Sequence, residues 1–323
     1  MTVLLDTTGE AVLRQLAAER RGDGVASGLA LTLIASFDEP HRDAVEEAAT
    51  FAAAAHPCRL LLVCRQVNGA SRTRDRLDAE VVVGGRLGGC EAVIMRMQGR
   101  LALHADSVVL PLLAPDVPVV TWWCGPPPER IATDPLGVAA DRRITDTARA
   151  DDPVAALHQR AVDYASGDTD LAWTRLTGWR TLLAAALDGP DTAPPVGATV
   201  TASPSDSSAA LLAGWLQDRL GVAPSRVESV SGALESVRLD LADGGAVTLT
   251  RSEGCAVLSR TGQQDRVMPL PSPTLGELLS EELRRLNADV AYARALSAAT
   301  GVPDLERRPA RRVHLWVEPE LAR

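Results

Sequence analysis

Apolar runs of strand length alternate with stretches of helical spacing in the first half of the chain. Residues 28–36 and 58–66 are short apolar runs, and residues 37–55 between them are rich in alanine and have helical spacing. A strand, a helix and a second buried strand form a βαβ unit, in which the two strands are normally parallel. This pattern predicts a Rossmann-like α/β layer fold with a largely parallel sheet.

The alternation of strands and helices continues up to residue 164. Residues 80–84 and 92–97 are predicted strands, and the glycine-rich stretch 84–89 is a predicted turn that allows them to pair in the antiparallel sense. The other elements expected in this half are helices at 10–21, 101–113, 135–141 and 155–164, and strands at 117–123 and 142–146.

The stretch 167–188 predicts a single helix of about five turns, because apolar residues recur on one face at helical spacing. Asp168 or Thr169 can accept a hydrogen bond from the first backbone N–H groups of this helix. Acidic residues here also suit the positive end of the helix dipole. The apolar face carries Ala172, Leu176, Trp179, Leu183 and Leu187.

Short runs with alternating apolar and polar positions dominate the rest of the chain. We expect strands at 198–202, 226–231, 235–241, 246–251, 255–260 and 266–270, and helices at 205–220, 274–286 and 290–299. From residue 226 on, the short strands follow one another without a helix between them, which predicts an antiparallel meander. The predicted organisation is an N-terminal α/β domain at 1–164, a C-terminal α+β domain at 165–300 and a basic tail at 301–323, in which 313–317 can form an edge strand.

Composition narrows the classes of function. The chain has 323 residues, of which 46 % are hydrophobic and 23 % charged, so it is globular and long enough for two cores. Its formal net charge of −9 gives it no general attraction for nucleic acid or anionic lipid. All 33 basic residues are arginines, which excludes a lysine Schiff base and a Walker-type lysine.

The sequence predicts a cytoplasmic protein. The first ten residues have neither a basic region nor a long apolar region, as a secretory signal would. The most apolar stretch, 107–124, is interrupted by three prolines and an aspartate, so it does not fit a membrane helix. The five cysteines form no CxxC pair, which is typical of reduced thiols.

The motifs of common enzyme classes are missing from the sequence. The first predicted strand of the βαβ unit is followed by Phe37, Asp38, Glu39 and Pro40, where a dinucleotide enzyme would carry GxGxxG. There is no HExxH or HxH spacing for a metal and no GxSxG nucleophile elbow. We therefore predict no enzymatic activity, no cofactor and no metal site.

Tryptophan and arginine side chains are the candidate contacts to a partner protein, because these residue types anchor protein interfaces. They are Trp122, Trp123, Trp173, Arg175 and Arg180. The alternative is that the indoles pack inside the protein. Trp122 and Trp123 also end a predicted strand, and strand ends line the ligand crevice of an open α/β sheet, so a crevice position is a further alternative.

Several long segments together resemble one protein family. They are HPCR at 56–59, DRLDAEVVVGG at 75–85, GCEAVIMRM at 89–97, HADSVVLPLLAPDVPVVTWWCG at 104–125, RRITD at 142–146, GDTDLAWTRLTGWRTLLAAALD at 167–188 and ELLSEELRRLNADVAYARAL at 277–296. In this order they resemble the actinobacterial type of OpcA, the glucose-6-phosphate dehydrogenase assembly protein.

The resemblance implies a protein that is not itself an enzyme. It would bind glucose-6-phosphate dehydrogenase and support the assembly or the active oligomeric state of that enzyme, at the entry to the oxidative pentose phosphate pathway. Such an allosteric activator must bind one state of its partner better than another. A hypothesis from another class is a sensor or enzyme that binds a nucleotide or sugar phosphate in the crevice of the N-terminal domain.

Overall fold

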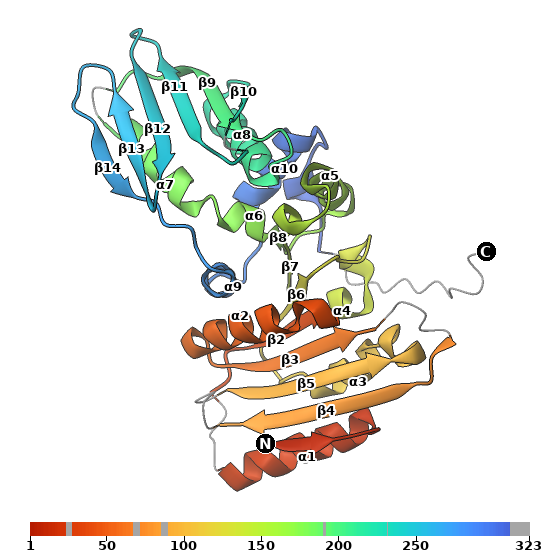
Figure 1. Ribbon diagram of the computed structural model, residues 1–323. Helices are drawn as coiled ribbons and strands as arrows, with labels where there is room; N and C mark the ends of the chain where they lie inside the picture. Colours follow the sequence, from red (N-terminus) through yellow and green to blue (C-terminus); the bar gives the residue numbers. More distant parts are fainter. Residues whose placement is uncertain (24–27, 67–71, 85–89, 190–191, 231, 311–323) are drawn as a thin grey trace. The chain divides into compact units, whose positions relative to one another are not determined.

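The computed structural model describes residues 1–23, 28–66, 72–84, 90–189, 192–230 and 232–310 (Figure 1). The chain forms two compact units. The first unit comprises Met1–Asp146, Thr274–Ala288 and the residues from Pro309 on, and the second comprises Thr147–Pro273 and Asp289–Arg308. The predicted limits 1–164, 165–300 and 301–323 divide the chain differently and stay a prediction. The expected edge strand at 313–317 lies outside the described residues.

The first unit contains a mostly parallel sheet, which confirms the predicted fold class. Its strands are β1 (Thr2–Leu4), β2 (Leu31–Phe37), β3 (Cys58–Arg65), β4 (Arg76–Val83), β5 (Glu91–Gln98), β6 (Val119–Cys124) and β7 (Arg142–Thr145), in the order β1-β4-β5-β3-β2-β6-β7. Strands β5, β3, β2, β6 and β7 are parallel neighbours. Strand β4 pairs antiparallel with β5, as expected, and with β1, which the sequence did not predict.

Helical segments accompany this sheet. They are α1 (Gly9–Asp23), η1 (Glu39–His41), α2 (Arg42–Ala55), η4 (Gly99–Ala102), α3 (Asp106–Val109), η5 (Leu110–Leu112), η6 (Ile131–Thr133), α4 (Pro135–Val138) and α9 (Leu275–Leu283). The helix predicted at 101–113 is wrong, because this stretch consists of three short pieces. Pro111 lies in the last piece, and its ring has no N–H to continue an α-helix.

Buried ion pairs fix two parts of the first unit. Arg59 on β3 donates to the Glu91 carboxylate on β5 at 2.9 Å, and Arg20 of α1 reaches the other oxygen of Glu91 at 2.8 Å. Arg142 on β7 donates to Glu282 of α9 and, at 2.8 Å, to the carbonyl of Asn287. Arg142 and Glu282 are both buried. The second pair therefore holds a segment distant in sequence against the sheet.

The second unit contains a sheet with the strand order β10-β9-β11-β12-β13-β14. Its elements are η7 (Thr147–Arg149), α5 (Pro153–Asp163), β8 (Asp168–Asp170), α6 (Leu171–Thr174), α7 (Thr177–Leu187), β9 (Pro195–Ala202), α8 (Ser207–Leu220), β10 (Ser225–Glu228), β11 (Ser236–Leu241), β12 (Ala246–Ser252), β13 (Cys255–Arg260), β14 (Arg266–Pro269), α10 (Val290–Thr300) and η8 (Leu305–Arg307). Strands β11–β14 form the expected antiparallel meander, and β9 pairs antiparallel with β11. The expectation that 226–231 joins it in the antiparallel sense is wrong, because β10 pairs parallel with β9 through the α8 crossover.

The single helix predicted at 167–188 is also wrong. Residues Asp168–Asp170 are a short strand, and two helices, α6 and α7, follow it with a break at Arg175 and Leu176. Asp170, not Asp168 or Thr169, caps α6, because its side chain accepts the N–H of Ala172 at 2.8 Å. The same carboxylate accepts the backbone N–H and the hydroxyl of Thr147. These bonds hold Asp170 extended and buried, so the helix starts only after it.

Candidate functional site

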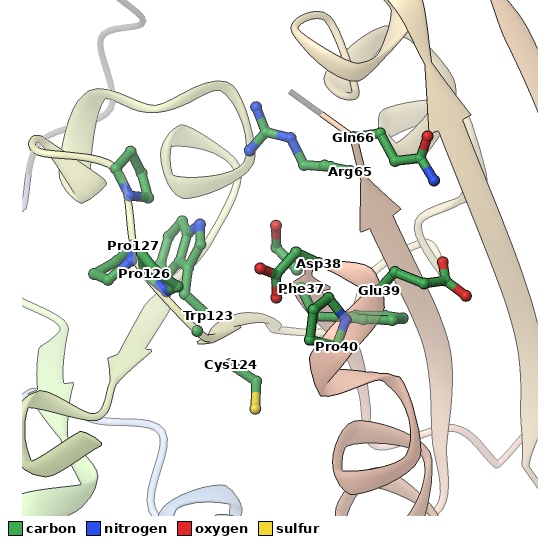
Figure 2. Close-up of a pocket in the computed structure, with 13 residues that line it drawn as sticks. Phe37, Asp38, Glu39, Pro40, Arg65, Gln66, Trp123, Cys124, Pro126 and Pro127 are labelled. Atoms are coloured by element: carbon green, nitrogen blue, oxygen red, sulfur yellow. The ribbon is translucent and has the colours of Figure 1, made fainter. Parts of the chain in front are cut away.

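A crevice lies in the first unit at the point where the strand order of the sheet reverses, next to β2. The chain runs from β2 to β3 on one side and, later, places β6 on the other side of β2. Ligands of open α/β sheets bind at such a point, outside the carboxyl ends of the strands. A cavity of about 670 Å³ lies there, and its walls are formed by Ser36–Pro40, Arg65, Gln66 and Trp123–Pro128 (Figure 2).

Gly125 allows two loops of the crevice to approach closely. It follows the last residue of β6 and has φ +117°, a conformation that side-chain-bearing residues rarely adopt. A Cβ atom at Gly125 would lie 3.2 Å from Nδ1 of His41 and 3.3 Å from Oδ1 of Asp38. His41 and Asp38 also contact each other directly. The loop after β6 is therefore packed against the loop after β2.

The start of α2 is a poor place for a phosphate group. A helix N-terminus binds phosphate through unused N–H groups and a positive dipole. Here Pro40 has no N–H, the N–H of His41 donates to the Asp38 carbonyl at 3.0 Å, and that of Arg42 donates to the Glu39 carbonyl. The carboxylates of Asp38 and Glu39 are 49 % and 46 % exposed and would repel an anion.

The end of β3 supplies hydrogen-bond donors to the same crevice. The Arg65 side chain is 15 % exposed, its Nε donates to the Ala102 carbonyl at 2.9 Å, and Nη1 lies 3.8 Å from a carboxylate oxygen of Asp134. Gln66 follows as an exposed amide. Figure 2 shows Arg65 and Gln66 at one end of the crevice, with Asp38 and Glu39 below them. The two ends therefore differ in hydrogen-bonding character.

The Cys64 thiol contacts Glu39, one of the residues that line the crevice. It donates to Glu39 at 3.2 Å, and Glu39 also accepts from Arg96 at 3.2 Å. Burial, together with the hydrogen bond to Glu39, raises the pKa of Cys64 to about 12. The thiol is therefore protonated near neutral pH and acts as a hydrogen-bond donor.

The predicted contact residues lie in two places, and all three indoles are buried. Trp122 and Trp123 point to opposite faces of β6 and are 0 % and 2 % exposed. Trp123 also lines the crevice, which agrees with the third alternative derived from the sequence. Their role in binding a partner stays a prediction.

Trp173 belongs to the core of the second unit. Its Nε1 donates to Asp289 at 2.9 Å, and its ring lies 6.1 Å from that of Tyr292. The guanidinium of Arg180 stacks 3.6 Å above the centre of the Trp173 ring, while Arg175 and Arg180 are each only partly buried. The stacking stabilises the Arg180 side chain through a cation–π interaction.

Sequence reasoning did not single out the polar residues of the crevice as a site. Asp38, Glu39, Arg65 and Gln66 are common surface residue types, and no motif marks them. The one available indication was their position directly after apolar strands, since the ends of parallel strands converge at one edge of a sheet.

Metal clusters and membrane-spanning helices are both absent from the described residues. They contain no cluster of three or more His, Cys, Asp or Glu side chains arranged to hold a metal ion. Among the helices of the same residues, none is both long and apolar enough to cross a membrane.

Comparison with known proteins identifies relatives over most of the chain. Residues 49–162 match the family model described as glucose-6-phosphate dehydrogenase subunit N-terminal domain, and residues 166–296 match the model for the C-terminal domain of that subunit. Two cyanobacterial relatives carry the provisional name OxPP cycle protein OpcA. The relative from Synechocystis sp. is 25 % identical over 77 % of this chain, and that from Synechococcus elongatus is 29 % identical over 42 %.

The chain is shorter than these relatives. It covers 53 % of the Synechocystis protein and 32 % of the Synechococcus protein. Among solved structures, the 3-ketoreductase KijD10 from Actinomadura kijaniata, determined with NADP, is similar over 88 % of this chain and all of its own, with a TM-score of 0.45 and 11 % identity. No conclusion about chemistry follows at that level of similarity. The two family models match successive stretches of the sequence that together cover most of it, and the chain belongs to the OpcA family of glucose-6-phosphate dehydrogenase subunit proteins.

Proposed function

We propose that this chain is a non-catalytic accessory protein of glucose-6-phosphate dehydrogenase. It binds the enzyme in the cytoplasm and promotes its assembly or its active oligomeric state. The observation that carries this proposal is the match to both domains of the family, each described as part of a glucose-6-phosphate dehydrogenase subunit. The absence of nucleophile and metal motifs in the sequence agrees with a role other than catalysis.

An accessory protein of this kind activates through a difference in affinity. It shifts the dehydrogenase toward the active assembly only as far as it binds that assembly more tightly than the inactive form. A tenfold difference corresponds to about 1.4 kcal/mol. Activation should therefore rise with the concentration of this chain and saturate when the active assembly is fully bound.

The test is an assay of the purified cognate dehydrogenase with and without this chain, run beside size-exclusion chromatography with light scattering. We expect a co-eluting complex and raised activity. A dehydrogenase whose activity and elution are the same in the presence of this chain would contradict the proposal.

The partly exposed arginines are the contact residues most amenable to mutation. Arg175→Ala and Arg180→Ala should weaken the complex, because arginine at an interface donates several hydrogen bonds. Arg266→Ala is the matched control, because Arg266 is an exposed arginine on β14 outside the predicted contact set. Equal binding by all three variants would exclude this surface as the contact.

The crevice favours a second candidate function, a sensor for a small ligand such as a nucleotide or sugar phosphate. Its position at the switch point of the sheet and its size are typical of ligand sites in α/β proteins. Thermal unfolding of this chain alone with NADP or glucose 6-phosphate tests it, since a bound ligand raises the melting temperature.

A further inference from the structure

The crevice has an acceptor end and a donor end, and we propose that it binds a phosphorylated monosaccharide rather than a dinucleotide. The sugar hydroxyls face Asp38, Glu39 and the loop after β6, and the phosphate faces Arg65. This assignment rests on the second function above, the binding of a small ligand in the crevice, and is independent of the binding of the dehydrogenase.

The rim next to α2 offers mainly acceptors. Pro40 on one side and Pro126 and Pro127 on the other have carbonyl groups but no N–H. The carboxylates of Asp38 and Glu39 add further acceptors, and both are about half exposed. A complementary ligand must donate hydrogen bonds at this end, which sugar hydroxyls do and phosphate dianions do not.

A buried donor lies on the wall between the two ends. Trp122, Trp123 and Trp179 each have an indole N–H with no hydrogen-bond acceptor among the described residues, and of these three Trp123 lines the crevice. Figure 2 shows its indole between Pro127 and Asp38, with the ring nitrogen toward the Arg65 end. A hydroxyl both donates and accepts, so a sugar can satisfy this N–H and the acceptor rim together.

The opposite end suits an anionic group. A guanidinium carries five N–H donors, and the contacts of Arg65 with Ala102 and Asp134 leave further donors on it. Figure 2 shows the Arg65 side chain on the same side as Trp123 and Asp38, while the exposed Gln66 side chain points the opposite way. A phosphate at this end would make charge-assisted hydrogen bonds, which are stronger than neutral ones.

A dinucleotide would need phosphate-binding groups at the start of α2, where this crevice has acceptors. In Rossmann-type sites the pyrophosphate lies at the N-terminus of the helix after the first strand, on glycine-rich backbone. In this chain that position has Glu39 and Pro40, and the first N–H groups already donate to Asp38 and Glu39. The charged groups of the crevice are also mostly paired, Glu39 with Arg96 and Arg65 with Asp134, which suits a ligand with a single phosphate.

The test is calorimetric titration of the purified full chain with glucose 6-phosphate, glucose and NADP. We expect saturable binding of glucose 6-phosphate, at least tenfold weaker binding of glucose and no binding of NADP. Asp38→Ala should weaken glucose 6-phosphate binding about tenfold by removing an acceptor, and Arg65→Gln about tenfold by removing the charged donor, where each 1.4 kcal/mol is tenfold.

Glu228→Ala, an exposed carboxylate on β10, is the matched control and should bind as the unaltered chain does. Binding of NADP with no binding of glucose 6-phosphate would overturn this proposal but leave a nucleotide sensor standing. Binding of none of the three ligands would overturn both. Glucose 6-phosphate binding that Asp38→Ala and Arg65→Gln leave unchanged would place the sugar elsewhere and overturn the assignment of this crevice.

Discussion

Single residues set the shape of the crevice and of the second core. Gly125 fits because it has no Cβ, whereas Trp173 fits because its indole has both an apolar ring and an N–H that reaches Asp289. At each of these positions, even a small change of the side chain should lower the stability of the protein. Substitutions at these two positions separate effects on the crevice from effects on the core of the second unit.

Gly125→Ala should destabilise the first unit by about 1–3 kcal/mol, because the new Cβ crowds His41 and the backbone is held at a strained φ. Denaturant unfolding measures this free energy. Gly28→Ala is the control, since its Cβ would meet nothing within 4 Å. Equal stability of the two variants would contradict the close packing of the two loops.

Trp173→Ala should reduce the free energy of unfolding by about 3–5 kcal/mol, the usual cost of removing a buried aromatic side chain. Trp173→Phe keeps an aromatic ring but loses the hydrogen bond to Asp289, so it should cost less. Thermal unfolding of both variants distinguishes these contributions. If Trp173→Ala is as stable as the unaltered chain, the indole does not contribute to the core.

At the scale of elements, capping decides where helices begin. Helix α6 begins only after Asp170, which caps it. Helix α9 begins at a capping box, in which Thr274 accepts the N–H of Glu277 and Glu277 accepts the N–H of Thr274. The β9–α8–β10 crossover likewise makes β10 parallel to its neighbour. Local sequence preference therefore identified most elements, but contacts fixed their ends and directions.

Thr274→Ala should destabilise the first unit by about 1 kcal/mol through loss of the cap of α9. The bonds from Thr274 lower the pKa of Glu277. A lowered folded-state pKa contributes stability above the unfolded pKa, and this contribution is lost as the pH falls through the folded pKa. Unfolding of Glu277→Gln and the unaltered chain at several pH values should show a difference that shrinks on acidification. A difference that grows instead would contradict the capping box.

At the scale of the whole molecule, the first unit is discontinuous in sequence. Helix α9 follows the strands of the second unit along the chain but packs with α2 in the first. The Nε2 atom of His56 lies 2.9 Å from the carbonyl oxygen of Ser280, and the buried pair Arg142–Glu282 holds the helix to β7. The first unit therefore depends on residues more than a hundred positions away from its sheet.

Glu282→Ala should destabilise the first unit by about 3–5 kcal/mol, since it leaves the buried Arg142 without its carboxylate. Hydrogen exchange followed by mass spectrometry should show lost protection in α9 and β7. Glu281→Ala is the control, because it makes the same substitution one position earlier in α9 and leaves the Arg142–Glu282 pair in place. Unchanged exchange in β7 of Glu282→Ala would show that the pair does not hold this segment.

Hydrophobic periodicity was enough to predict the two kinds of sheet, because a buried parallel strand and a half-exposed antiparallel strand differ within a few residues of chain. The residue types after the first βαβ strand showed directly that GxGxxG is missing there, because that motif is a local feature of the sequence. Periodicity did not reveal the break at Asp170, the parallel β10, the place of α9 or the two ends of the crevice. Each of these features depends on a hydrogen bond or contact between residues far apart in sequence, such as the bond between Asp170 and Thr147. Local sequence patterns do not contain such contacts, because the residues meet only when the chain folds.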